Sequence, residues 1–107
     1  MTMTDDAEPM VLPLAGDLDS AAAAKVREAF ALLPAGTTVL VDLDGVRFVD
    51  SAGLGAIIGA VRRARETSGA VVLCRPQPAV DRALRLAGVD RITPIRPTVE
   101  APPPPDV

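Results

Sequence analysis

The 107-residue sequence contains no histidine, and this absence restricts its chemistry more than any other feature. Histidine is the usual general base, a common metal ligand and the base of a Ser-His pair. Cys74 is the only cysteine, which excludes an internal disulfide and a Cys-x-x-Cys motif. Because Cys74 follows the apolar run Val71-Val72-Leu73, we expect it to be a small core residue. The composition therefore disfavours an enzyme and predicts neither a cofactor nor a metal.

Aromatic residues and excess basic charge are also missing. The chain has no Trp, no Tyr and two Phe, and its net charge is -3. Binding to a nucleic acid needs a basic face, and stacking on its bases needs aromatic side chains, so direct nucleic-acid binding is not expected. The longest apolar run, 52–61, is well short of the ~20 residues of a membrane-spanning helix. The acidic N-terminus lacks the basic start of a signal peptide, and we expect a cytoplasmic protein without membrane contact.

Along the sequence, strand-like patterns of apolar residues alternate with helix-like patterns. Strands are expected at 11–14, 37–43, 70–74 and 92–95, and helices at 20–33, 51–65 and 78–87. Such alternation predicts an α/β fold with a mostly parallel sheet of four to five strands and three or four helices. Pro13 lacks an N–H and places the first strand toward a sheet edge, and Asp44-Gly45 predicts a turn that closes the second strand.

Composition sets the expected limits of the folded unit. A chain of this length suits one domain, which we expect at residues 10–96. Residues 1–9 form a polar N-terminal segment without clear structure. Residues 97–107 are rich in proline and predict a disordered tail.

The turn from Asp50 to Gly55 is the segment most suggestive of function. It leads from a strand into a helix, and the first N–H groups of a helix are unpaired and attract anions. Gly53 and Gly55 are poor helix formers, which cost about 0.8–1 kcal/mol each relative to Ala. Close approach of another backbone or of a partner would offset this cost. Alternatively, Asp50 or Ser51 is simply an N-cap residue, and the glycines only permit tight packing of the helix on the sheet.

The helix that follows is apolar all round from Ala52 to Val61, with charges only from Arg62 onward. A helix of this kind is either fully buried or presents an apolar surface to a partner. Full burial is difficult in so small a chain. We therefore expect part of its first turns to be a docking surface.

Three segments of the chain resemble a known family. The sequence FVDSAGLGAIIGAVRRARETSGAVVLCRP is similar to the signature region of STAS domains, specifically those of bacterial anti-sigma factor antagonists. The upstream LPLAGDLDSAAA resembles the turn into the first helix of that family, and PAVDRALRLAGVDRI resembles its third helix. The resemblance spans roughly residues 11–95 and implies a STAS-like single domain.

The resemblance also implies a mechanism for regulating transcription by partner switching. Such proteins bind an anti-sigma factor that is also a serine kinase and thereby free a sigma factor. The kinase phosphorylates the motif serine, which breaks the complex, and a phosphoserine phosphatase restores it. By position the phosphorylated residue is Ser51. Partner-binding residues implied by the motif and the first loop are Asp17, Asp19, Asp50, Ser51, Ala52, Gly53, Leu54 and Gly55.

Two departures from the family concern the edge of the sheet. Relatives usually have an extra strand before the one at Val11, and residues 1–9 offer little to build it. Pro13 also lies inside a strand that should be well paired. Both leave the Ser51 motif untouched.

Two other interpretations remain open. Some STAS domains are non-phosphorylated adaptors that dock on an ATPase subunit, for example in lipid-transport complexes. An enzyme would need Asp42, Asp44 and Asp50 to cluster around Ser51 as a metal or acid-base site, but no Lys or His is placed to activate a nucleophile.

Overall fold

The computed structural model describes residues 9–99, and its elements alternate as predicted. The strands are β1 (Met10–Leu18), β2 (Thr38–Val49), β3 (Ala70–Cys74) and β4 (Ile95–Arg96). The helices are α1 (Ser20–Ala31), α2 (Ser51–Glu66) and α3 (Pro78–Leu86), with a short 3-10 helix at Val89–Arg91. The predictions for the segments before residue 9 and after residue 99 lie outside the described residues.

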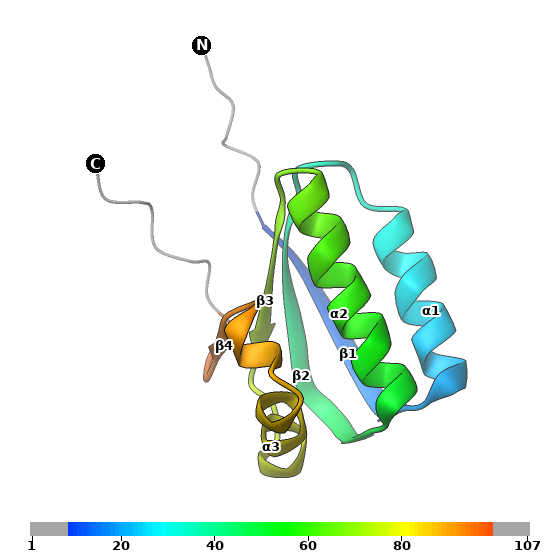
Figure 1. Ribbon diagram of the computed structural model, residues 1–107, viewed down its shortest axis with the longest axis vertical. Coiled ribbons are helices and arrows are strands. Elements are labelled where there is room, and N and C mark those ends of the chain that lie inside the picture. The colour runs from blue at the N-terminus through cyan, green and yellow to red at the C-terminus, as the bar shows by residue number, and fades with distance from the viewer. Residues whose placement is uncertain (1–8, 100–107) are drawn as a thin grey trace.

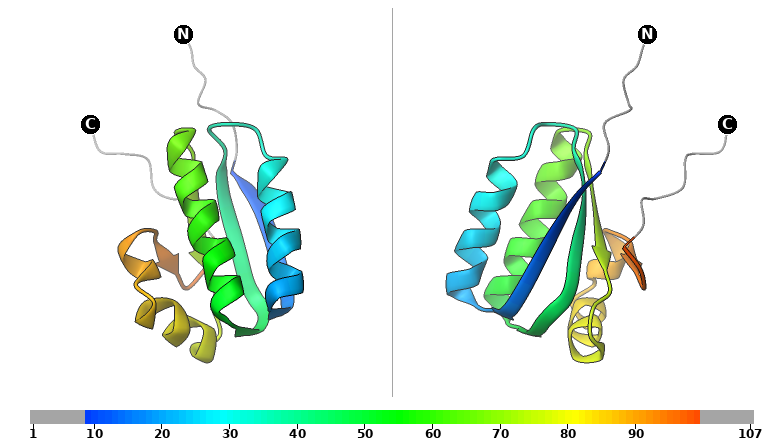
Figure 2. Two further views of the ribbon diagram at one scale, coloured as in Figure 1. Left: turned by 45° about the vertical axis from the view of Figure 1, so that its right-hand side comes forward. Right: turned by 180° about the vertical axis from the view of Figure 1, so that it is seen from behind.

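All neighbouring strands are parallel, in the order β1-β2-β3-β4. This confirms the predicted α/β class. Helices α1 and α2 lie side by side on one face of the sheet (Figures 1 and 2). Both begin at the end of the sheet where β1 and β2 finish. Within residues 9–99, β1 is an edge strand, which agrees with the position inferred from Pro13.

The predicted turn at Asp44-Gly45 is wrong, because β2 continues through it to Val49. The pairing of β1 with β2 shifts register between Pro13 and Ala15, as in a β-bulge. A Cβ on Gly45 would lie 3.0 Å from the carbonyl oxygen of Leu14 and 3.1 Å from the Cβ of Ala15. The glycine therefore serves a close approach of two strands rather than a reversal of the chain.

Two predicted boundaries near the C-terminus also change. The last strand begins at Ile95 rather than Ile92, because a 3-10 turn uses the N–H of Ile92 to bond the carbonyl of Val89. Val99, in the segment expected to be a disordered tail, is half-buried and packs against Leu40, Val72 and Cys74. The packed part of the chain thus extends three residues beyond the expected limit at 96.

The main core fills the space between the helices and the sheet. Helix α1 contributes Ala23, Val26 and Phe30, which recur every three or four residues and are buried. Leu43 and Leu73 supply the sheet side and are fully buried. Cys74 is also buried, as predicted for a small core residue.

An ion pair joins Asp42, within β2, to Arg75, which directly follows β3. The Arg75 guanidinium donates from Nε and Nη2 to the two carboxylate oxygens of Asp42, at 3.1 and 2.8 Å. The Asp44 N–H donates to Asp42 Oδ1 as well, at 3.1 Å. The hydrogen bonds from Arg75 are the main reason that the pKa of Asp42 lies below the ordinary value of 3.8.

This lowered pKa predicts a loss of stability in acid. The contribution of Asp42 is fully present above the unfolded-state pKa and disappears as the pH falls through the folded-state pKa. Asp42→Asn should lower the free energy of unfolding by about 0.5–1 kcal/mol at neutral pH, since Arg75 is partly exposed. The difference from wild type should shrink toward about pH 3. Urea denaturation at both pH values measures it, and an equal difference at both would contradict the prediction.

Candidate functional site

The carboxyl ends of β1 and β2 place two helix starts beside each other. Leu18 is paired with Val49, and its carbonyl oxygen accepts a hydrogen bond from the Asp50 N–H at 3.2 Å. The first turn of α2 therefore lies directly against the end of β1 (Figure 2). Asp17 and Asp19 flank Leu18, so the residues implied by the family resemblance do come together at one end of the sheet.

Asp50 is the N-cap of α2. Its Oδ1 accepts a hydrogen bond from the Gly53 N–H at 3.0 Å, and its carbonyl accepts one from the Leu54 N–H at 2.9 Å. Ser51 is the first helical residue and is exposed. The choice of Asp50 or Ser51 as the cap is thereby decided. Because the carboxylate performs the capping, the Ser51 hydroxyl is not needed for it.

The start of α1 has the same local geometry. Asp19 is its N-cap, with Oδ1 accepting from the Ala22 N–H at 3.1 Å, and Ser20 follows as the first helical residue. The φ and ψ angles of Asp19 (-100° and -169°) nearly match those of Asp50 (-104° and -172°). Ser20 is exposed, as Ser51 is. The chain thus supplies its own reference position for Ser51.

Gly53 and Gly55 have different roles in the structure, although the sequence pattern suggested the same role for both. Gly53 is buried, and a Cβ on it would lie 2.3 Å from the carbonyl oxygen of Leu18. This glycine is therefore required for the packing of α2 on β1. Gly55 is exposed, and a Cβ on it would meet no atom within 4 Å. Packing within the fold does not explain Gly55, so the expectation of a surface role still applies to it.

The solvent-facing side of α2 carries small residues rather than large apolar ones. The buried residues of α2 are Gly53, Ala56, Ile57, Ala60 and Val61. Ala52 and Leu54 are half-buried, and the exposed positions of the first two turns are Ser51 and Gly55. Part of the first turns is therefore exposed, as a docking surface would require, but large apolar side chains do not form that part, and docking itself stays a prediction.

Phe48 is a surface residue that the sequence interpretation did not single out. Its side chain is 51% exposed, and it is paired in register with Asp17 at the end of β1. It lies two residues before Asp50. Its place just before the turn from Asp50 to Gly55 was the signal available in the sequence.

The acidic cluster required for catalysis is not formed. Asp42 and Asp44 both approach the Arg75 guanidinium, at 2.8 and 3.8 Å, whereas Asp50 caps α2. No group of three or more His, Cys, Asp or Glu side chains able to hold a metal ion occurs among residues 9–99. In the same part of the chain, no helix has the length and apolar character needed to cross a membrane.

Comparison with protein families agrees with this geometry. A model of the STAS domain family matches residues 1–101, and the chain belongs to that family. The STAS domains of anti-sigma factor antagonists are non-enzymatic regulatory domains. The resemblance noted from the sequence is therefore confirmed.

The relatives with assigned roles include anti-sigma factor antagonists. The anti-sigma F factor antagonist of Lysinibacillus sphaericus is 29% identical over 85 residues, which cover 77% of this chain and 73% of the relative. The anti-sigma-B factor antagonist of Listeria monocytogenes is 29% identical over 93 residues, which cover 85% and 82%.

Solved structures show the same fold. The unphosphorylated anti-sigma factor antagonist SpoIIAA superposes with a TM-score of 0.61 at 25% identity, over 86% of this chain and 79% of that one. The STAS domain of a SulP transporter from Vibrio cholerae gives a TM-score of 0.71 at 19% identity, covering 91% and 77%. The second likeness concerns the fold alone.

The two glycines give a prediction with an internal control. Gly53→Ala should destabilise the fold by about 1–3 kcal/mol, because its Cβ would collide with the Leu18 backbone. Gly55→Ala should stabilise it by up to about 1 kcal/mol, because the helical position is open and alanine is the better helix former. Urea denaturation of both variants measures the two changes. A destabilising effect of similar size in both would show that Gly55 also serves packing.

Proposed function

We propose that this chain is an anti-sigma factor antagonist controlled by phosphorylation of Ser51. In this role it binds a kinase-type anti-sigma factor and releases a sigma factor, and a phosphoserine phosphatase reverses the modification. The observation that carries the proposal is the exposed Ser51 at the start of α2, with Asp50 acting as the cap in its place. The names of the relatives support the general role. Since these partners act on the transcription machinery, the proposed location is the cytoplasm.

The proposed docking surface surrounds the start of α2. It contains the exposed or half-buried residues Asp17, Asp19, Asp50, Ser51, Ala52, Leu54 and Gly55, together with Phe48. Gly53 contributes from beneath the surface by keeping α2 close to β1. A partner backbone can approach Gly55 closely, because this residue presents no side chain. The exposed ring of Phe48 offers apolar area next to an otherwise acidic turn.

Phosphorylation would change this surface without disturbing the fold. It adds about -1.5 to -2 charges. The helix dipole stabilises such a charge by only about 0.3–1 kcal/mol at an exposed position, while the carboxylate of Asp50 next to Ser51 opposes it. Burial of the same charge unpaired in an interface costs several kcal/mol. The phosphate therefore blocks docking by local charge and bulk.

Ser51 is also the only hydroxyl residue in the motif, because position 52 is alanine. The site of modification is therefore defined by one side chain. A non-phosphorylated STAS adaptor that docks on an ATPase subunit would use the same helix but would not require this hydroxyl. Transfer of phosphate to Ser51 separates the two roles.

The first experiment incubates the chain with ATP and kinase-type anti-sigma factors and locates phosphate by mass spectrometry. Wild type should gain one phosphate on Ser51, and Ser51→Ala should gain none because it lacks the hydroxyl. Ser20→Ala is the matched control, since Ser20 is also exposed and also follows an N-cap aspartate. It should be phosphorylated like wild type. Persistent phosphorylation of Ser51→Ala would refute the assignment of the site.

The second experiment measures binding of the same anti-sigma factor by calorimetry. Phosphoserine at position 51 should weaken binding by about 100-fold or more, because an unpaired charge would be buried. Ser51→Asp carries one charge on a shorter side chain and should weaken binding less. Ser51→Ala should bind like wild type. Undiminished binding of the phosphorylated chain would contradict the proposed mode of action.

A further inference from the structure

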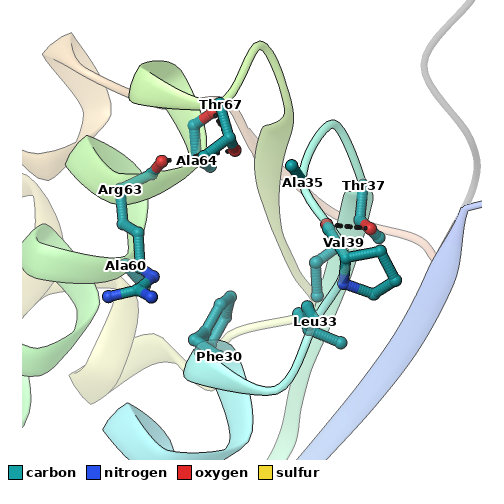
Figure 3. Close-up of a pocket in the computed structure, with 10 residues that line it drawn as sticks. Phe30, Leu33, Ala35, Thr37, Val39, Ala60, Arg63, Ala64 and Thr67 are labelled. Atoms are coloured by element: carbon teal, nitrogen blue, oxygen red, sulfur yellow. Dashed lines mark hydrogen bonds between the residues drawn. The ribbon is translucent and has the colours of Figure 1, made fainter.

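A groove between α1 and α2 lies beyond the docking surface described above. It has a volume of about 270 Å³ and lies between the second half of α1 and residues 56–66 of α2. Its lining residues are Arg27 and Phe30 of α1 and Ala56, Gly59, Ala60, Arg62, Arg63 and Glu66 of α2. An adjoining cavity of about 170 Å³ shares Phe30, Ala60 and Arg63 with it. Figure 3 shows this cavity, with the Arg63 side chain extending from α2 toward Phe30.

The groove has an excess of positive charge in an acidic protein. Arg27, Arg62 and Arg63 are all exposed, and Glu66 is the single acidic residue in the lining. None of the ion pairs formed within residues 9–99 includes these three arginines. In contrast, Arg75 and Arg85 are paired with aspartates. The net charge of the chain is -3, so this local excess is not a consequence of composition.

The floor of the groove is apolar and shallow. Phe30, Ala56 and Ala60 are buried, with 9%, 3% and 7% of their surface exposed. Gly59 is exposed, and a Cβ on it would meet no atom within 4 Å. A bound group can therefore lie close to the α2 backbone while its charged atoms reach the arginines on both sides.

We propose that this groove binds an acidic segment of a protein partner. Carboxylates of the segment would pair with Arg27, Arg62 and Arg63, and its backbone would lie against Gly59. Charge complementarity favours an acidic occupant, and the spread of the three arginines over two helices favours a segment with several carboxylates over one small inorganic anion. This binding does not require phosphorylation of Ser51.

The groove lies on the same helix as Ser51, so one docked partner can contact both. Ser51, Gly55 and Gly59 are exposed at intervals of four residues, and Arg62 and Arg63 follow within one turn. A partner segment that runs along this side of α2 would meet the Ser51 turn at one end and the arginines at the other. The two surfaces can therefore contribute to one interface or act separately.

The test is an NMR titration of the full ¹⁵N-labelled chain with two synthetic peptides. Both are capped amphipathic helices of Leu, Ala and Lys, with Glu at positions four residues apart in one and Gln there in the other. The Glu peptide should shift the amide signals of Arg27, Phe30, Gly59 and Arg63, and its affinity should fall as salt is raised. The Gln peptide should bind about tenfold more weakly or not at all.

Arginine variants supply the matched controls. The double variant Arg62→Gln/Arg63→Gln should lose about tenfold or more in affinity for the Glu peptide. Arg82→Gln, which removes an exposed arginine of α3, should bind like wild type. All of these positions are exposed, and thermal unfolding should be unchanged in each variant.

Three results would overturn the proposal. The first is equal shifts with both peptides, and the second is the absence of shifts at millimolar Glu peptide. The third is saturation of the same signals by inorganic phosphate at a lower concentration than the Glu peptide requires, which would indicate a small-anion site. Neither peptide contains a kinase or a phosphorylated residue. Failure here would therefore leave phosphorylation of Ser51 untouched, and failure of the kinase assay would leave this test valid.

Discussion

The contact of Gly53 with the end of β1 is the constraint on which the candidate site depends. A Cβ at this position would lie 2.3 Å from the Leu18 carbonyl oxygen, and the same oxygen accepts the Asp50 N–H. The helix start is thereby fixed against the sheet by backbone atoms, without help from the Ser51 side chain. Under the proposed function, phosphate on Ser51 changes the charge of this turn while other groups hold the structure around it. A reversible switch on a small domain requires that the residue to be modified is not one of the groups that hold the fold together.

The same contact orients the rest of α2. Its apolar side, including Ile57 and Val61, packs into the core. The opposite side carries small residues near Ser51 and arginines further along the helix. The helix therefore presents two chemically distinct surfaces, an acidic turn at its start and a basic groove in its second half.

Much of the fold could be predicted because its signals are local. The period of the apolar residues in α1, the N-cap aspartates and the apolar run of β3 each determine an element through near neighbours. Asp44-Gly45 was misread because a glycine in a bulge and a glycine in a turn look alike in sequence, and only the pairing with β1 distinguishes them. The same distinction between local signals and contacts distant in sequence applies to the candidate site. Ser51 and Asp50 were recognisable from the motif, whereas the different roles of Gly53 and Gly55 depend on contact with Leu18, which is distant in sequence. The basic groove could not be predicted, because it requires α1 and α2 to be adjacent.

The claim that phosphate acts locally on an intact fold is tested most directly by comparing amide NMR spectra of the chain with and without phosphate on Ser51. A fold held by Gly53 and Leu18 predicts shifts confined to the turn at Asp17–Ser20 and the first two turns of α2. Signals of β3 and α3 should be unchanged, and hydrogen exchange in the core strands should be equally slow in both forms. Widespread shifts in β3 or α3, or faster exchange in the core, would show that the phosphate rearranges the domain and would contradict a switch that works through its surface alone.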